Sequence, residues 1–186
     1  KIKKYWKQNI EINPVFIDNK IIFVSADLKI IAVNVKSGKI IWEIQCLDEP
    51  SRRGMVISNE GKNKYLFINI KNKLFKINIK NGKLEKKFGN KGYIGISSSL
   101  IAPAIFNNSI YISSFSTIEG YDLGTGKITS KINFHPKKRN FWGAIPWSGS
   151  ALDKNYGILY LSTGNPRPAL VGINRPGKNY NSNSLI

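Results

Sequence analysis

Three segments of this sequence recur at a constant spacing and end alike: VNVKSGKIIWEI (residues 33–44), INIKNGKLEKKF (77–88) and YDLGTGKITSKI (121–132). Their turn glycines, Gly38, Gly82 and Gly126, each lie 44 residues from the next. Apolar and polar residues alternate before each glycine, and this period of two is typical of a β-strand. Glycine takes the positive φ that tight hairpin turns require. Each segment is therefore predicted to form two antiparallel strands joined by a glycine turn.

A second repeat lies upstream of these hairpins. PVFIDNKIIFVS (14–25) matches PAIFNNSIYISS (103–114), and each predicts two strands joined by an Asp-Asn or Asn-Asn turn. The two kinds of hairpin together give four antiparallel strands in about 44 residues, which is the size of one β-propeller blade.

The chain is therefore predicted to be all-β and to form one partial β-propeller domain over residues 1–186. Its repeat units close near residues 45, 88 and 132, and a further blade opens at residue 150. This is about half of a propeller of up to eight blades. A solenoid of β-hairpins is the alternative architecture. Because the sequence starts at Lys1 without an initiator Met and stops on Leu185-Ile186, which resembles the start of another strand, we expect a piece of a longer protein.

The formal net charge is +18, from 29 Lys and Arg against 11 Asp and Glu. Such a balance is typical of proteins that bind nucleic acid or another polyanion. The lysines are scattered through turns and alternate strand positions, so we expect a solvated basic surface and no nucleic-acid partner. The single cysteine, Cys46, excludes an internal disulfide and a multi-cysteine metal site within this stretch. No apolar run approaches the roughly 18–20 residues of a membrane helix.

Further landmarks follow one another in order along nearly the whole chain: Trp42 after the first glycine turn, RRGM (52–55), FGNKGYI (88–94), LDKNYGILYLSTGNP (152–166) with Trp147 before it, and GINRPGKNYNSNSLI (172–186). This set resembles the dehydrogenases that depend on pyrroloquinoline quinone (PQQ). The pieces FGNKG and NRPG are most similar to the membrane-bound glucose and sugar-alcohol dehydrogenase branch.

The resemblance implies an eight-bladed propeller that binds PQQ and Ca²⁺ and oxidises sugars or alcohols in the periplasm. It also implies electron transfer to ubiquinone or a cytochrome, and membrane association through segments outside this sequence. The alternative is a non-enzymatic scaffold built from the same repeat, of the outer-membrane assembly type.

Three residues match the family's cofactor-binding positions. By resemblance, Arg53 pairs with a PQQ carboxylate, which suits a guanidinium fork. Trp147 forms the flat floor beneath the quinone, and Asn165, eighteen residues later, supplies an amide oxygen to Ca²⁺. Each has a plain alternative: a surface arginine, a packing tryptophan and a turn asparagine. Trp142 is a second candidate for the floor.

The resemblance leaves the catalytic base unassigned. The family's general base is an Asp in a later blade, which this sequence does not contain. The only histidine, His135, lies in a basic polar loop and is interpreted as a surface residue. Glu119 falls on a predicted strand instead of a loop, so it is not assigned to the metal.

Overall fold

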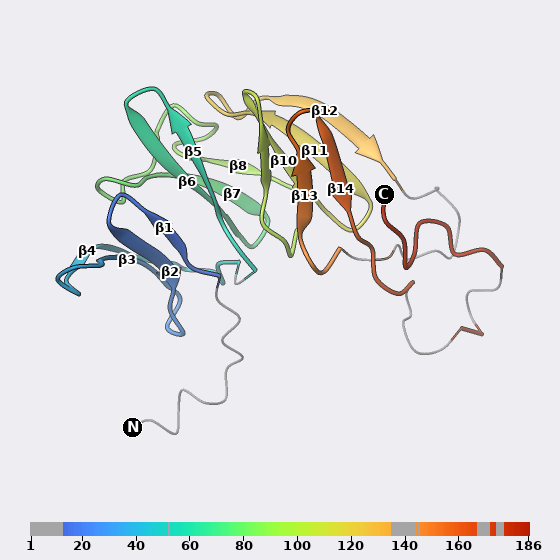
Figure 1. Ribbon diagram of the computed structural model, residues 1–186, viewed down its shortest axis with the longest axis horizontal. Helices are drawn as coiled ribbons and strands as arrows, with labels where there is room; N and C mark the ends of the chain where they lie inside the picture. The colour runs from blue at the N-terminus through green and yellow to red at the C-terminus, as the bar shows by residue number, and fades with distance from the viewer. Residues whose placement is uncertain (1–12, 52, 135–143, 145, 167–171, 174–176) are drawn as a thin grey trace, which may run out of the picture. The chain divides into compact units, whose positions relative to one another are not determined.

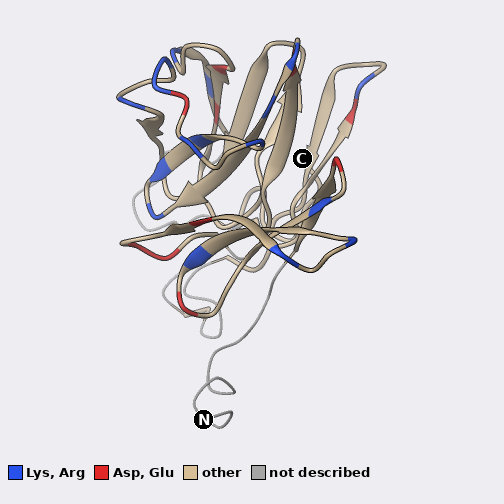
Figure 2. Cartoon of the chain, turned by 90° about the vertical axis from the view of Figure 1, so that its left-hand side faces the viewer, with Lys and Arg blue, Asp and Glu red and all other residues tan. Residues whose placement is uncertain are grey.

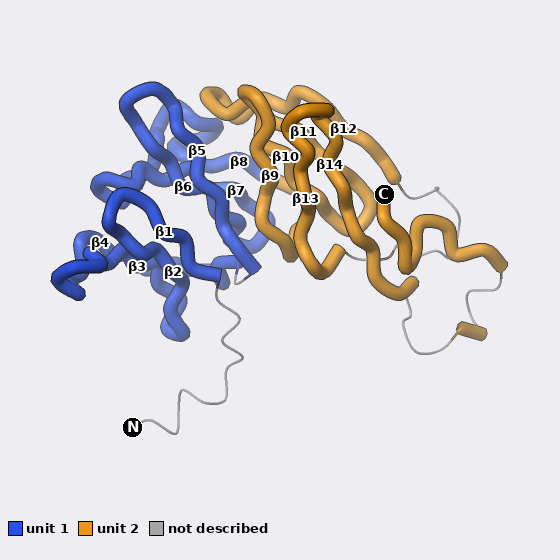
Figure 3. The backbone as a smooth tube through the Cα atoms, viewed as in Figure 1, with its two compact units in different colours: residues 1–95 blue, residues 96–186 orange. Residues whose placement is uncertain are grey.

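A computed structural model describes residues 13–51, 53–134, 144, 146–166, 172–173 and 177–186. The chain divides into two compact units, Lys1–Gly95 and Ile96–Ile186, which Figure 3 shows in different colours. Every strand pairing in the described residues is antiparallel, and these residues contain no helix. The all-β fold with four-stranded antiparallel sheets is therefore confirmed.

The first unit contains two four-stranded sheets, each with its strands in chain order. The first sheet is β1 (Val15–Ile17), β2 (Lys20–Val24), β3 (Lys29–Asn34) and β4 (Ile40–Gln45). The second is β5 (Val56–Glu60), β6 (Asn63–Ile70), β7 (Lys73–Asn78) and β8 (Tyr93–Gly95). One apolar core joins them, because Ile22, Ile30 and Ala32 from the first sheet cluster with Leu66 and Ile68 from the second.

The second unit contains one four-stranded sheet and one hairpin. The sheet is β9 (Ala104–Phe106), β10 (Ser109–Ser113), β11 (Thr117–Asp122) and β12 (Ile128–Asn133), and the hairpin is β13 (Ser150–Asp153) with β14 (Ile158–Leu161). A smaller core of Ile101, Phe134 and Leu161 lies in this unit. The predicted turns between β1 and β2 and between β9 and β10 are confirmed, and Asp18, Asn19 and Asn107 have positive φ there.

The three glycine turns share one hydrogen-bonded geometry. Gly38, Gly82 and Gly126 have φ of 68°, 72° and 73°. In each turn the glycine N–H donates to the backbone oxygen of the residue four positions earlier: Asn34, Asn78 and Asp122. The side-chain oxygen of that same residue accepts a backbone N–H of the turn, at 2.7–3.0 Å. The repeated Asn or Asp thus fixes the turn that the glycine makes possible.

Trp42 holds the first sheet against the glycine turn of the second. Its indole Nε1 donates to the backbone oxygen of Ile79 at 2.9 Å, and its ring is buried. A Cβ built at Gly82 would stand 2.9 Å from the Trp42 ring, whereas one built at Gly38 would meet no atom within 4 Å. The second glycine is therefore required by packing as well as by its backbone conformation.

The second sheet closes differently from the repeat. After Gly82 the sequence predicts a fourth strand that ends near residue 88, but only the isolated bridge between Ile77 and Leu84 forms there. A turn with Phe88 N–H donating to Glu85 O follows, and the fourth strand is β8, at Tyr93–Gly95. The Phe88 ring is fully buried and packs edge-on against Phe67, at 5.5 Å between centroids. Burial of this ring favours the turn over a continued strand.

Lys76 is a buried cation on the face of the second sheet that also carries Phe67. Its exposure is 1%, and its Nζ lies 2.6 Å from Glu60 Oε2 and 4.3 Å from the centre of the Tyr65 ring. Ser58 Oγ donates to the other Glu60 oxygen at 2.7 Å. A buried ammonium is stable only when it is paired and hydrogen-bonded, and this arrangement satisfies that condition.

The charged positions of both units are spread over turns and strands, and Asp and Glu lie among the Lys and Arg (Figure 2). The described residues contain no helix that is long and apolar enough to span a membrane.

We predict that Gly82→Ala destabilises the protein more than Gly38→Ala does. Both substitutions force alanine into a left-handed conformation, which costs about 1–2 kcal/mol. Only Gly82→Ala also presses a methyl group against Trp42, which adds about 1–3 kcal/mol of overpacking. Unfolding of both variants in guanidinium chloride measures the difference, and equal losses would contradict the packing role of Gly82.

We also predict that Glu60→Gln lowers the free energy of unfolding by about 3 kcal/mol, because it leaves the Lys76 ammonium buried without its counter-charge. The matched control is Glu43→Gln, which removes the carboxylate from the solvent-exposed pair with Lys29. That loss is expected to stay below about 1 kcal/mol. Urea unfolding checks both, and similar effects at the two positions would refute this role for Glu60.

Candidate functional site

The β13–β14 hairpin brings Trp147 and Asn165 to one end of the same pair of strands. Ser150 pairs with Leu161, so the residues before β13 and those after β14 leave the hairpin on the same side. The hydroxyls of Ser148 and Ser162 are 2.5 Å apart across that end. Trp147 and Asn165, eighteen residues apart in the sequence, thus lie in segments that leave the same end of the hairpin.

Both side chains offer surfaces to a ligand. Trp147 is 43% exposed, and Asn165 is exposed, while Pro166 after it is buried. An exposed indole provides a large flat face for stacking, and an amide oxygen is a hard donor that suits Ca²⁺. Pro166 anchors the backbone directly after Asn165.

The loop that carries Asn165 is tied at its base by the last residues of the chain. Leu161 and Ile186 exchange both backbone hydrogen bonds, at 2.8 and 2.9 Å, and Ser162 bridges to Leu185. These bonds hold the C-terminal residues beside the end of β14. Asn183 N–H donates to Gly164 O at 2.9 Å, one residue before Asn165.

Thr163 is the centre of this tie. Its side chain is buried, its Oγ1 donates to Asn181 O at 2.6 Å, and the same oxygen accepts Ser184 N–H at 3.2 Å. Its own N–H donates to Ser184 O at 2.9 Å. The sequence analysis did not single out Thr163. The feature of the sequence that points to Thr163 is its position two residues before Asn165.

Arg53 lies in the link between β4 and β5, in the other compact unit. It is partly exposed, and its backbone oxygen accepts the Asn13 side-chain amide at 3.2 Å. Gly54 and Met55, which follow it, are buried. This link fixes the backbone at Arg53 and leaves the guanidinium on a partly solvated surface. Trp142, Arg175 and His135 lie outside the described residues.

Glu119 is fully occupied within its own unit. Lys131 Nζ, Tyr121 Oη and Ser97 Oγ lie 2.6, 2.9 and 3.0 Å from its carboxylate oxygens, and the side chain is buried. Burial alone would raise the pKa of Glu119, but these hydrogen bonds outweigh it and hold the pKa below its usual value. Burial and the same carboxylate raise the pKa of Tyr121. Because its oxygens are committed, Glu119 is a structural anion and not a metal ligand.

The candidate residues offer suitable groups for PQQ but few oxygen ligands for Ca²⁺. A guanidinium and an exposed indole match a planar, anionic quinone. Calcium takes six to eight oxygen ligands, and no three His, Cys, Asp or Glu side chains gather within the described ranges. Asn165 could supply one oxygen to such a shell, and the other ligands would have to come from other residues.

Comparison with known proteins gives the family. The model of the PQQ family, "Glucose/ethanol/alcohol dehydrogenase, beta-propeller domain", matches residues 2–127. The chain belongs to this family. Arg53 lies inside the matched range, and Trp147 and Asn165 lie after it. No curated protein matches the sequence.

Solved structures of low sequence identity share the propeller fold. The quinohemoprotein alcohol dehydrogenase from Comamonas testosteroni superposes with a TM-score of 0.69 at 15% identity, over 93% of this chain and 32% of that one. A europium-containing methanol dehydrogenase gives a TM-score of 0.63 at 12% identity, over 82% of this chain and 35% of its own. BamB from Moraxella catarrhalis gives 0.57 at 17% identity, over 84% and 44%. The chain thus spans about a third of the length of the two dehydrogenases.

We predict that Thr163→Val loosens the base of the Asn165 loop while leaving the glycine turns intact. The substitution keeps the shape of the side chain and removes two hydrogen bonds at a buried position, which weakens this region by about 1–3 kcal/mol. Hydrogen–deuterium exchange should speed up in residues 181–186. The control, Thr125→Val, removes a hydroxyl from an exposed turn and should change exchange only there. Unchanged protection of residues 181–186 in Thr163→Val would contradict the tie.

Proposed function

We propose that this chain is part of the propeller of a PQQ- and calcium-dependent dehydrogenase that oxidises sugars or alcohols. Family membership supports a quinoprotein of the oxidoreductase kind. The observation that carries the proposal is the β13–β14 hairpin, which places an exposed indole and an exposed amide at one strand end. A clamped loop presents the amide, as a rigid metal ligand requires.

Each of the three residues has a distinct task in this proposal. Arg53 pairs with a carboxylate of PQQ, Trp147 stacks against its ring system, and Asn165 donates its side-chain oxygen to the metal. When bound, PQQ would supply the hydride acceptor for the oxidation, and the metal would supply a Lewis acid. The described residues orient this group and exclude water from one of its faces. We assign none of the described residues as the base that would take the proton of the substrate.

The finer assignments follow the sequence motifs. FGNKG and NRPG favour the membrane-bound glucose and sugar-alcohol branch, whereas the similar solved structures are alcohol and methanol dehydrogenases. We propose a periplasmic protein that passes electrons to ubiquinone or a cytochrome, with any membrane attachment outside this sequence.

A non-enzymatic scaffold is the second candidate. The structural similarity to BamB favours it, because that protein shares the fold over 84% of this chain. A scaffold needs the glycine-turn repeat, but it needs neither an exposed indole nor a clamped amide at the end of β14. The two candidates therefore differ in whether Trp147 and Asn165 bind a cofactor.

Titration of the full-length apo-protein with PQQ and Ca²⁺ tests the proposal. We expect PQQ to quench tryptophan fluorescence and Trp147→Ala to raise its Kd about tenfold, since stacking of large rings is worth about 1 kcal/mol or more. The control is Tyr156→Ala, an aromatic residue of the same hairpin that lies in the turn at its other end. It should leave the Kd unchanged.

The metal is tested in the same titration. Asn165→Ala should raise the Ca²⁺ concentration needed for PQQ binding, and Asn155→Ala, in the distant turn, should not. Two results together would favour the scaffold instead. The protein would oxidise neither glucose nor alcohols with an artificial dye acceptor, and Trp147→Ala would leave the Kd for PQQ unchanged.

A further inference from the structure

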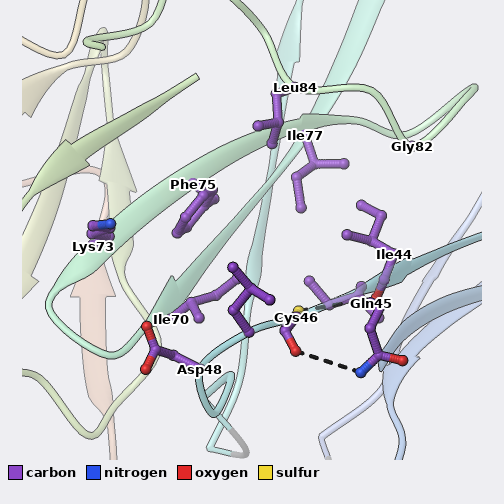
Figure 4. A pocket seen from close by; sticks show the side chains of 12 residues that line it. Ile44, Gln45, Cys46, Asp48, Ile70, Lys73, Phe75, Ile77, Gly82 and Leu84 are labelled. Carbon is purple, nitrogen blue, oxygen red and sulfur yellow. Dashed lines mark hydrogen bonds between the residues drawn. The ribbon is translucent and has the colours of Figure 1, made fainter. Parts of the chain in front are cut away.

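A pocket opens into the apolar core between the two sheets of the first unit (Figure 4). Its volume is about 290 Å³. Apart from Leu47, six large apolar side chains line it: Ile30, Ile44, Ile70, Phe75, Ile77 and Leu84. They come from β3 and β4 on one side and from β6, β7 and the segment after Gly82 on the other. The pocket thus lies where the sheets diverge beside their shared core.

Of the uncharged polar groups in the pocket wall, the Gln45 amide nitrogen is already hydrogen-bonded and the Cys46 thiol is only weakly polar. Gln45 Nε2 donates to Asp27 O at 3.0 Å and to Cys46 O at 3.4 Å, so backbone oxygens already engage this nitrogen. Cys46 is 7% exposed, and burial raises the pKa of its thiol, which therefore stays neutral and acts as a weak donor. The lining thus favours an apolar occupant over a sugar or another polar molecule.

The lining contains two charged residues of opposite sign, Asp48 and Lys73. Asp48 is neutralised by Lys71, whose Nζ lies 3.1 Å from Asp48 Oδ1. Lys73 Nζ lies 4.7 Å from the centre of the Tyr93 ring, and no salt bridge of the described residues includes it. One positive charge is therefore left over at Lys73.

We propose that this pocket binds a medium-chain carboxylate, with the alkyl chain among the isoleucines and the carboxylate at Lys73. An apolar cavity of about 150 Å³ holds a benzene ring, so about 290 Å³ has room for roughly ten carbon atoms. Charge complementarity selects an anionic end group over a neutral one. The site lies wholly in the first unit and does not depend on the proposed cofactor residues.

A series of straight-chain acids tests the apolar part of the site. Binding of butanoate, hexanoate and octanoate to the full-length protein is measured by calorimetry. Each added methylene should tighten the Kd by about threefold to fourfold until the pocket is full. Leu84→Trp, at a partly exposed lining position, should abolish this gain. Affinities that do not change with chain length would overturn the proposal.

Replacing the lysine tests the anionic part. Lys73→Met should weaken octanoate about fivefold or more and leave octanol unchanged. The control, Lys62→Met, removes the same charge from the exposed turn between β5 and β6 and should have no effect. Equal binding of octanol and octanoate to the unmodified protein would overturn the role of Lys73.

Alkylation of Cys46 gives a readout that needs no variant. Octanoate should slow the reaction of this thiol with N-ethylmaleimide, measured by mass spectrometry on the peptide that contains Cys46, and acetate should not. Trp147→Ala should keep this protection, which separates the pocket from the proposed cofactor site. Failure of octanoate to protect Cys46, at a concentration that calorimetry shows to be saturating, would place the ligand elsewhere and refute the proposal.

Discussion

The first unit depends on one contact, in which the Trp42 indole lies on the glycine turn of the next sheet. The ring needs a neighbour without a Cβ, and its Nε1–H satisfies the Ile79 carbonyl that would otherwise be buried without a partner. This one side chain therefore both packs on the turn of the next sheet and hydrogen-bonds to its backbone. Residues at the equivalent repeat positions are Lys86 and Ser130, so the first repeat alone carries this tryptophan.

The other repeats use different means to cover their sheets. In the second, the buried Phe88 ring packs on Phe67 and displaces the expected strand. In the third, β12 is exposed along its whole length. Each repeat keeps the same glycine turn. The side chains that pack beside the turn differ from one repeat to the next.

The buried charged residues of this protein are different from the residues proposed to bind the cofactor. Lys76 and Glu119 lie inside the sheets, and their partners satisfy them, so both serve the fold. Arg53, Trp147 and Asn165 all lie in links outside the strands, and each is at least partly exposed. In β-propellers and other scaffolds, functional groups commonly lie on the loops that connect rigid strands.

The sequence by itself determined the three glycine turns, the hairpins of the first and third repeats, their period and the family. Turn chemistry and strand alternation are local properties, so Gly38, Gly82 and Gly126 could be interpreted without knowing their neighbours. It also suggested Trp147 with Asn165, from spacing and resemblance. Only the tertiary structure decided that Phe88 folds inward, that Thr163 clamps the loop and that a pocket opens beside Cys46. These features depend on contacts between residues distant in the chain, and no local pattern encodes which side chains will meet there.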